Sequence, residues 1–257
     1  MTRENPIHRA AAEGFARGAD AYVKGRPDYP PEIAAWLRHR LDLGEGKTVV
    51  DLGAGTGKFT PYLLSTGATV NAVEPVPQML ARLTSTYPQA QPLSGSATSI
   101  PLANESVDAV VCAQAFHWFA TPTALAEIHR VLKPGGRLGL VWNLKDTRVG
   151  WVAALDSILT RYRADTPNFG SGNWRNAFPA EGFSPLHEDQ FTHEHAGPPD
   201  LVILERALST SFIAALAPEA QAQVVHDIQH LIAHELNGAS EVVVPYETKA
   251  YCVQKLG

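Results

Sequence analysis

The chain has 257 residues, of which 45% are hydrophobic and 18% are charged. That length and composition allow one large domain with a sizeable core and exclude an intrinsically disordered chain. The net charge of −5 comes without a run of lysine or arginine, and no window approaches the ~18 apolar residues of a membrane span. We therefore expect neither a nucleic acid nor a membrane as partner, and a cytoplasmic location.

Two helices are expected near the N-terminus, at 10–21 and at 31–41. From 48 to 143, short β-branched runs alternate with helical patterns, which predicts a doubly wound α/β fold with a mostly parallel sheet covered on both faces. The expected strands are 48–52, 69–74, 107–113 and 137–143, with a weaker one at 90–93, and the expected helices are 59–65, 78–87 and 124–132.

The pattern changes after residue 143. A helix is expected at 151–163, a loop at 168–176, a strand at 187–195, helices at 201–216 and 218–236, and a final strand at 241–253. The helices within 198–237 lie between two strands, which indicates an insert that caps the sheet. We expect one structural domain in three segments, namely an arm at 1–45, a core at 46–145 and the remainder at 146–257.

The most informative segment runs from Val49 to Gly57, where a strand leads into a glycine-rich loop and then a helix. The glycines are Gly53, Gly55 and Gly57. Glycine permits positive φ angles and lets a ligand approach the main chain, and the start of a helix offers unpaired N–H groups. The segment therefore predicts a nucleotide site.

Two acidic residues define that site further. Glu74 ends the strand 69–74, about twenty residues beyond the loop, where an acid accepts hydrogen bonds from ribose hydroxyls. Asp51 begins the loop, and its carboxylate would repel a pyrophosphate but attract a cationic ligand. The glycine spacing also differs from the dinucleotide pattern G-x-G-x-x-G. A positively charged, phosphate-free nucleoside is therefore favoured over a dinucleotide.

The stretch 51–57 resembles the first motif of class I S-adenosylmethionine (SAM)-dependent methyltransferases, with Glu74 as their ribose-binding acid and 132–136 as the turn before their fifth strand. The stretches 22–30, 115–119 and 142–146 are similar to the type 11 methyltransferases that include trans-aconitate methyltransferase-like proteins. The resemblance implies a seven-stranded Rossmann-like sheet whose last strand is antiparallel.

By the same resemblance, the arm is a helical lid in which Tyr22 covers the methionine end of SAM and Arg26 pairs with a carboxylate. The alternative is a solvated arm. Many relatives have an aspartate where this chain has Ser96, so the adenine contact is expected from the Ser96 hydroxyl or the Ala97 backbone. The complete set of expected cofactor contacts is Tyr22, Arg26, Asp51, Gly53, Ala54, Gly55, Gly57, Glu74, Pro75, Met79, Ser96, Ala97 and Gln114.

The substrate side is expected just after the strand 107–113, because ligands of open α/β sheets bind at the carboxyl ends of strands. His117 is the candidate catalytic residue. It has three possible roles: a general base, a polar contact to cofactor or substrate, or a histidine packed between aromatic neighbours. Trp118 and Asn143 are further candidates for contact with the substrate.

No metal is expected. No acidic residue follows the strand 107–113, where Ala113, Gln114 and Ala115 stand, so a metal-independent reaction is favoured. The residues His226, His230 and His234 are four apart and share one helix face, but no carboxylate or cysteine completes a metal site there. A solvated or partner-facing stripe is the expected role of these histidines.

The sequence thus predicts a metal-independent SAM-dependent methyltransferase that modifies a small molecule, preferably at oxygen, and releases S-adenosylhomocysteine. We expect a monomer or homodimer. Two alternatives remain, a non-catalytic SAM-binding protein and an NAD-dependent oxidoreductase.

Overall fold

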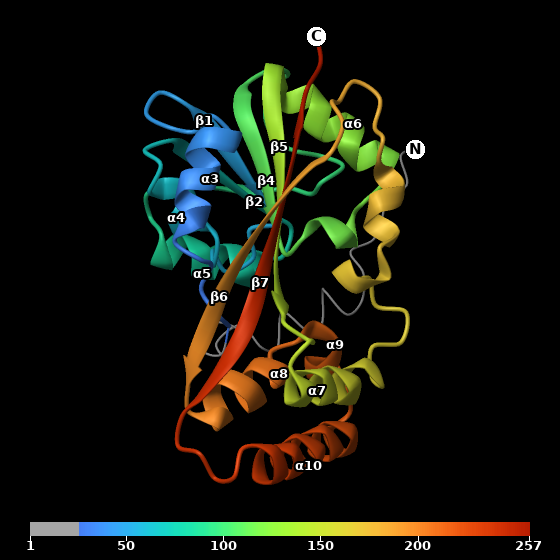
Figure 1. The fold of residues 1–257 in the computed structure, drawn as a ribbon. Coiled ribbons are helices and arrows are strands. Elements are labelled where there is room, and N and C mark those ends of the chain that lie inside the picture. The colour runs from blue at the N-terminus through green and yellow to red at the C-terminus, as the bar shows by residue number, and fades with distance from the viewer. Residues whose placement is uncertain (1–25) are drawn as a thin grey trace. The chain divides into compact units, whose positions relative to one another are not determined.

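The computed structural model describes residues 26–257 and divides the chain into two compact units (Figure 1). The sheet unit comprises Tyr29–Trp142, Pro167–Phe191 and Thr248–Gly257. The helical unit comprises Asn143–Thr166 and Thr192–Glu247 together with residues 26–28. The helix expected at 10–21 and the candidate residue Tyr22 lie outside the described residues. The division into three segments, arm, core and remainder, stays a prediction.

The seven strands form one sheet in the order β3-β2-β1-β4-β5-β7-β6. The pairs β1 with β2, β1 with β4, β2 with β3, and β4 with β5 are parallel. Strand β7 is antiparallel to β5, because Lys255 N donates to Gly136 O at 2.8 Å and Asp146 N donates to Pro245 O at 2.9 Å. The prediction of a seven-stranded, mostly parallel sheet is confirmed. The strand bounds are Thr48–Leu52, Thr69–Glu74, Gln91–Ser94, Val107–Ala113, Leu132–Lys145, His187–Gly197 and Val242–Gln254 for β1 to β7.

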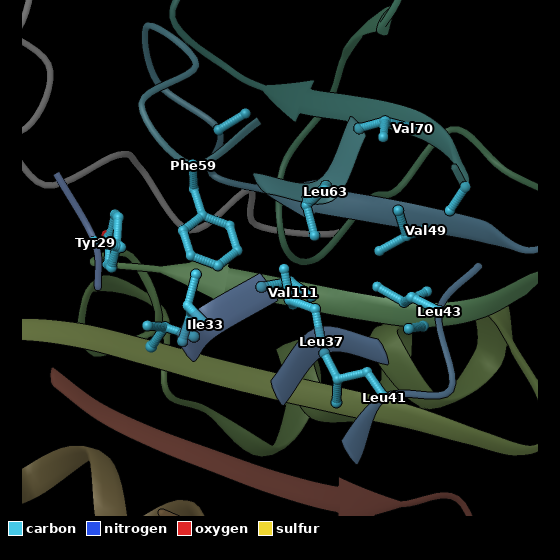
Figure 2. Packing of buried hydrophobic residues seen from close by; sticks show 14 of the residues in the cluster. Tyr29, Ile33, Leu37, Leu41, Leu43, Val49, Phe59, Leu63, Val70 and Val111 are labelled. Carbon is cyan, nitrogen blue, oxygen red and sulfur yellow. The ribbon is translucent and has the colours of Figure 1, made fainter. Parts of the chain in front are cut away.

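Helices cover both faces of the sheet unit. Figure 1 shows α3 and α4 to one side of β4 and β5, and α6 to the other. On the α3 side, Ile33 and Leu37 of α3, Leu63 of α4 and Val49 of β1 belong to one buried apolar cluster (Figure 2). The burial of these side chains removes apolar area from water, which is the main stabilising contribution to such a layer. The helix bounds are Glu32–Arg40 for α3, Thr60–Leu64 for α4, Pro77–Thr86 for α5 and Pro122–Val131 for α6.

The prediction of a turn at 132–136 is wrong, because those residues form the first part of β5. Leu132 pairs with Val107, and the register between β4 and β5 shifts between Val107 and Ala109. The glycines of the stretch therefore accommodate an irregularity within a strand and not a turn between elements.

The helical unit has a core of its own, formed by apolar side chains such as Leu155, Val202, Ile228 and Val244. The single helix expected at 201–216 is broken in the structure. Ser209 Oγ donates to the carbonyl of Arg206 at 2.8 Å, and Thr210 is extended, so the chain leaves the helix there. The helical elements are α7 (Gly150–Thr160), the π-helix η4 (Asp200–Glu205), α8 (Arg206–Leu208), α9 (Ser211–Ala214) and α10 (Pro218–Glu235).

The segment expected to be a loop at 168–176 contains two short 3₁₀ helices, η2 (Phe169–Ser171) and η3 (Asn173–Ala177). Their aromatic rings pack in the sheet unit, where the ring centroid of Trp142 lies 5.0 Å from that of Phe169 and 4.7 Å from that of Trp174. Within residues 26–257, no helix is both long enough and apolar enough to span a membrane.

Candidate functional site

The loop that joins β1 to α4 has the backbone that its glycines were expected to provide. The φ angles of Gly53, Gly55 and Gly57 are +70°, +59° and +88°, a region that residues with a side chain rarely adopt. Val73 O, near the end of β2, accepts hydrogen bonds from Gly53 N at 2.9 Å and from Ala54 N at 3.2 Å. The loop is thereby held against the carboxyl end of the neighbouring strand.

Asp51 lies beneath this loop with 1% of its surface exposed. Its Oδ2 accepts a hydrogen bond of 2.8 Å from the hydroxyl of Thr60, the first residue of α4. Burial raises the pKa of Asp51 to about 7; the Thr60 hydroxyl lowers it, and the nearby charge of Glu74 raises it further. The site thus contains a buried carboxyl group that titrates near neutral pH and that a cation would stabilise in its ionised form.

Glu74, the last residue of β2, is 5% exposed and contacts the loop directly. Its Oε2 accepts from Gly55 N and its Oε1 from Val76 N, both at 2.9 Å. Burial raises the pKa of Glu74, and the two backbone N–H groups oppose that rise. Each carboxylate oxygen retains a second lone pair for a ligand hydroxyl.

Met79 of α5 lies beside the loop, and the segment 96–99 follows β3. The Cε of Met79 lies 3.4 Å from the point that a Cβ on Gly55 would occupy. Ser96 and Ser99 exchange backbone hydrogen bonds, and the hydroxyls of Ser96 and Thr98 lie 3.2 Å apart. Ala97 between them is buried. The roles of these residues and of Pro75 in cofactor binding stay predictions.

The segment after β4 closes the other side of the loop. A Cβ on Gly53 would lie 2.9 Å from the Cβ of Ala115, so only glycine fits there without a shift. Gln114 has a φ of +57° and donates from its backbone N–H to Val141 O at 2.8 Å. A glutamine held in this sparsely populated conformation is the kind of local strain that is often found at functional sites.

His117 lies in the 3₁₀ helix η1 (Phe116–Trp118) and is oriented by a tryptophan of β5. The indole Nε1 of Trp142 donates to Nδ1 of His117 at 3.0 Å. Because an indole nitrogen only donates, Nδ1 carries no proton, and the neutral ring holds its proton on Nε2. In this tautomer, Nε2 is a hydrogen-bond donor and not a proton acceptor. The ring of Trp118 lies 5.2 Å from that of His117.

Two of the candidate residues belong to the helical unit. The guanidinium of Arg26 donates from Nη2 to Ser209 O at 3.2 Å, and Asn143 Nδ2 donates to Asp28 O at 3.1 Å. The structure therefore brings together the loop, Asp51, Glu74, Met79 and the segment 114–117 within the sheet unit. The roles proposed for Arg26 and Asn143 are untested.

Two partners in the sheet unit were not identified from the sequence. Thr60 contacts Asp51 and Trp142 contacts His117. The position of Thr60 at the start of the helix that follows the loop is a usable signal, because such a hydroxyl points back toward the strand end. The pairing of Trp142 with His117 has no such signal, because it depends on how β5 aligns with the residues after β4.

The role expected for the histidines of α10, a solvated or partner-facing stripe, stays a prediction. The rings of His230 and His234 lie 4.2 Å apart. Among residues 26–257, no group of three histidine, cysteine, aspartate or glutamate side chains is arranged to hold a metal ion.

Substitution of Gly57 by alanine should destabilise the protein by about 1–3 kcal/mol, because a side chain at φ +88° is strained and its Cβ would lie 2.8 Å from the Tyr87 ring. Urea unfolding measures the change. Gly44→Ala is the matched control, because no atom lies within 4 Å of the new Cβ. Equal stability of the two variants would show that the loop does not need its left-handed turn.

Known proteins resemble this chain in sequence and in fold. Residues 50–140 match the family model described as a methyltransferase domain. An uncharacterized methyltransferase-like protein of Schizosaccharomyces pombe is 39% identical over 241 residues, which cover 91% of this chain and 92% of that protein. The malonyl-[acyl-carrier protein] O-methyltransferase of Pectobacterium atrosepticum is 32% identical over 53% of this chain and 54% of its own length. A structure from Anaeromyxobacter dehalogenans, named as a type II methyltransferase, has a TM-score of 0.66 at 22% identity and covers 90% of this chain and 97% of that one.

Proposed function

Because this chain belongs to the family of SAM-dependent methyltransferases, we propose that it transfers the methyl group of SAM to an oxygen atom of a small molecule without a metal ion. The family membership establishes an enzyme that uses SAM, and the acceptor atom and the metal independence are the proposal. The pair of buried carboxyl groups at the glycine loop, Asp51 and Glu74, supports the cofactor site. The observation that carries the oxygen assignment is the hydrogen bond from Trp142 that leaves a proton on Nε2 of His117.

The residues at the loop fit SAM. Gly53, Gly55 and Gly57 adopt positive φ angles and carry no side chain with which a ligand at the main chain would collide. Two carboxyl groups whose charged forms are disfavoured by burial gain from a ligand with an ammonium and a sulfonium group, whereas a pyrophosphate would be repelled. We assign the cationic end of SAM to the side of Asp51 and the ribose to Glu74.

When bound, SAM supplies an electrophilic methyl group on a sulfonium centre. The protein's residues have to bind, orient and desolvate the reactants, and such positioning can contribute about 7–11 kcal/mol. His117, with its proton on Nε2, is suited to donate a hydrogen bond to an oxygen of the acceptor. A carboxylate or an already ionised oxygen needs no general base.

Two further observations support oxygen as the acceptor atom and a reaction without a metal ion. The Pectobacterium relative is by name an O-methyltransferase of a malonyl group. At the end of β4, Ala113, Gln114 and Ala115 offer no carboxylate that a catalytic metal would use, so the proposal involves none. A methyl-transfer assay with labelled SAM against a panel of carboxylates, alcohols and amines tests it. Labelled products confined to amines would contradict the oxygen assignment, and labelled products that disappear with a chelator would contradict metal independence.

Substitution of His117 by asparagine should lower kcat/KM about tenfold to a hundredfold, because Asn retains an acceptor for Trp142 but loses the Nε2–H donor. Thermal stability should stay close to wild type. His117→Gln, whose amide reaches toward the position of Nε2, should retain more activity than His117→Asn. If His117 instead acts as a base, wild-type activity will show an acidic limb that is absent from both variants.

A further inference from the structure

A group of basic side chains belongs to the helical unit. Lys145 ends β5, Arg163 follows α7, and Arg206 begins α8. The side chain of Lys145 is 16% exposed, and its ammonium lies 3.7 Å from Asp156 Oδ1. Burial lowers the pKa of Lys145 to about 8, and the charges of Arg206 and Arg163 lower it further against the opposing effect of Asp156. Lys145 thus has two cationic neighbours and one acidic neighbour.

Several hydrogen-bond donors of this cluster are buried and unused. Nε of Arg163 and Nε of Arg206 have no hydrogen-bond partner among residues 26–257. The same is true of the hydroxyl of Tyr246, a β7 residue that is 2% exposed. Buried donors are almost always paired in folded proteins, so three of them in one region call for acceptor atoms that the described residues do not supply.

The three donors belong to one neighbourhood. Burial raises the pKa of the Tyr246 hydroxyl, while Arg206, through its charge and its nearby N–H groups, and Arg26, through its charge, lower it. Nη1 of Arg206 donates to Thr210 Oγ1 at 3.1 Å, which fixes the guanidinium and leaves its Nε edge for another acceptor. The guanidinium carbon of Arg163 lies 5.9 Å from the ring centroid of Phe212, so the arginine is held against an aromatic wall.

We propose that Arg163, Arg206 and Tyr246, with Lys145 beside them, bind a small anion that carries a carboxylate or a phosphate. A guanidinium presents parallel donors that match the oxygens of either group, and a tyrosine hydroxyl adds a third donor. The ligand is a small molecule, because the groups that would bind it are buried.

Isothermal titration of the full chain at fixed ionic strength tests the site with tricarballylate as the carboxylate probe and phosphoethanolamine as the phosphate probe. Tricarballylamide is the uncharged control. We expect one of the two anions to bind and the triamide not to bind. Binding of tricarballylate alone identifies a carboxylate ligand, and binding of phosphoethanolamine alone identifies a phosphate ligand. Equal heats for both anions and the triamide would overturn the site.

Arg206→Gln and Arg163→Gln should each lower the affinity for the anion about tenfold or more, and Tyr246→Phe should lower it about threefold to tenfold. Tyr246→Phe removes only the unpaired hydroxyl, so it remains informative if an arginine variant fails to fold. Arg161→Gln is the matched control, because Arg161 lies near Arg163 but is 58% exposed and paired with Asp227 at 2.6 Å. Unchanged affinity in all three site variants, or the same loss in the control, would contradict the site.

Titration of the same variants with SAM separates the two proposals. Arg206→Gln and Tyr246→Phe should bind SAM as wild type does, since the glycine loop, Asp51 and Glu74 lie in the sheet unit. If wild type binds the anion but not SAM, the proposed function fails and the anion site stands.

Discussion

Substitution of Glu74 by glutamine should weaken SAM binding about a hundredfold. In the wild type, both carboxylate oxygens accept from backbone N–H groups, of Gly55 and of Val76. A glutamine offers one acceptor and one donor at these places, so its amide nitrogen must face a backbone N–H group and the loop loses one contact. The ligand also loses a charge-assisted hydrogen bond to its ribose, which is worth about 1.5–3 kcal/mol.

Isothermal titration with SAM measures this loss. Glu45→Gln, at an exposed position in the same unit, is the control and should bind as the wild type does. The finding that would refute the assignment of Glu74 is a Glu74→Gln variant with wild-type affinity for SAM.

Substitution of Asp51 by asparagine should weaken SAM binding and at the same time stabilise the ligand-free protein at pH 8. The pKa of Asp51 is raised in the folded state to about 7 from its ordinary value of 3.8. Its contribution to stability is therefore fully present below about pH 4 and is lost as the pH rises through 7. Asparagine has no such loss, so above pH 7 the variant should gain on the order of 2–4 kcal/mol in free energy of unfolding.

Urea unfolding of wild type and Asp51→Asn at pH 5 and at pH 8 tests the stability half. The difference between the two proteins should grow by about 2–3 kcal/mol from pH 5 to pH 8. For the cofactor, wild-type affinity should rise between pH 6 and pH 8 as Asp51 ionises, and the affinity of Asp51→Asn should stay low and vary little with pH. A stability difference that is the same at both pH values would show that Asp51 does not titrate in this range.

The strands β1, β2 and β4 begin and end at the residues that the sequence predicted. They are mostly buried on both faces, so most of their residues are apolar, with Asp51, Asn71 and Asp108 as interior exceptions. The register shift that lengthens β5 and the break at Ser209 depend on contacts with other segments, and local propensity does not encode such contacts.

The candidate site shows the same division. The glycines and the two acids of the loop could be predicted from their local spacing, because a strand, a tight turn and a helix follow one another there. The hydrogen bond between Trp142 and His117 joins residues that are 25 apart and fixes a tautomer that no local pattern predicts. The basic cluster of the helical unit draws on Lys145, Arg163, Arg206 and Tyr246, which only the folded chain brings together.

The measurement that tests the account most directly is a titration of the wild-type protein at pH 8 with SAM and, separately, with NADH. We expect SAM to bind well below millimolar concentration and NADH not to bind. A protein that binds NADH but not SAM would show that the loop of residues 51–57 accepts a pyrophosphate, and it would contradict the cationic site described here.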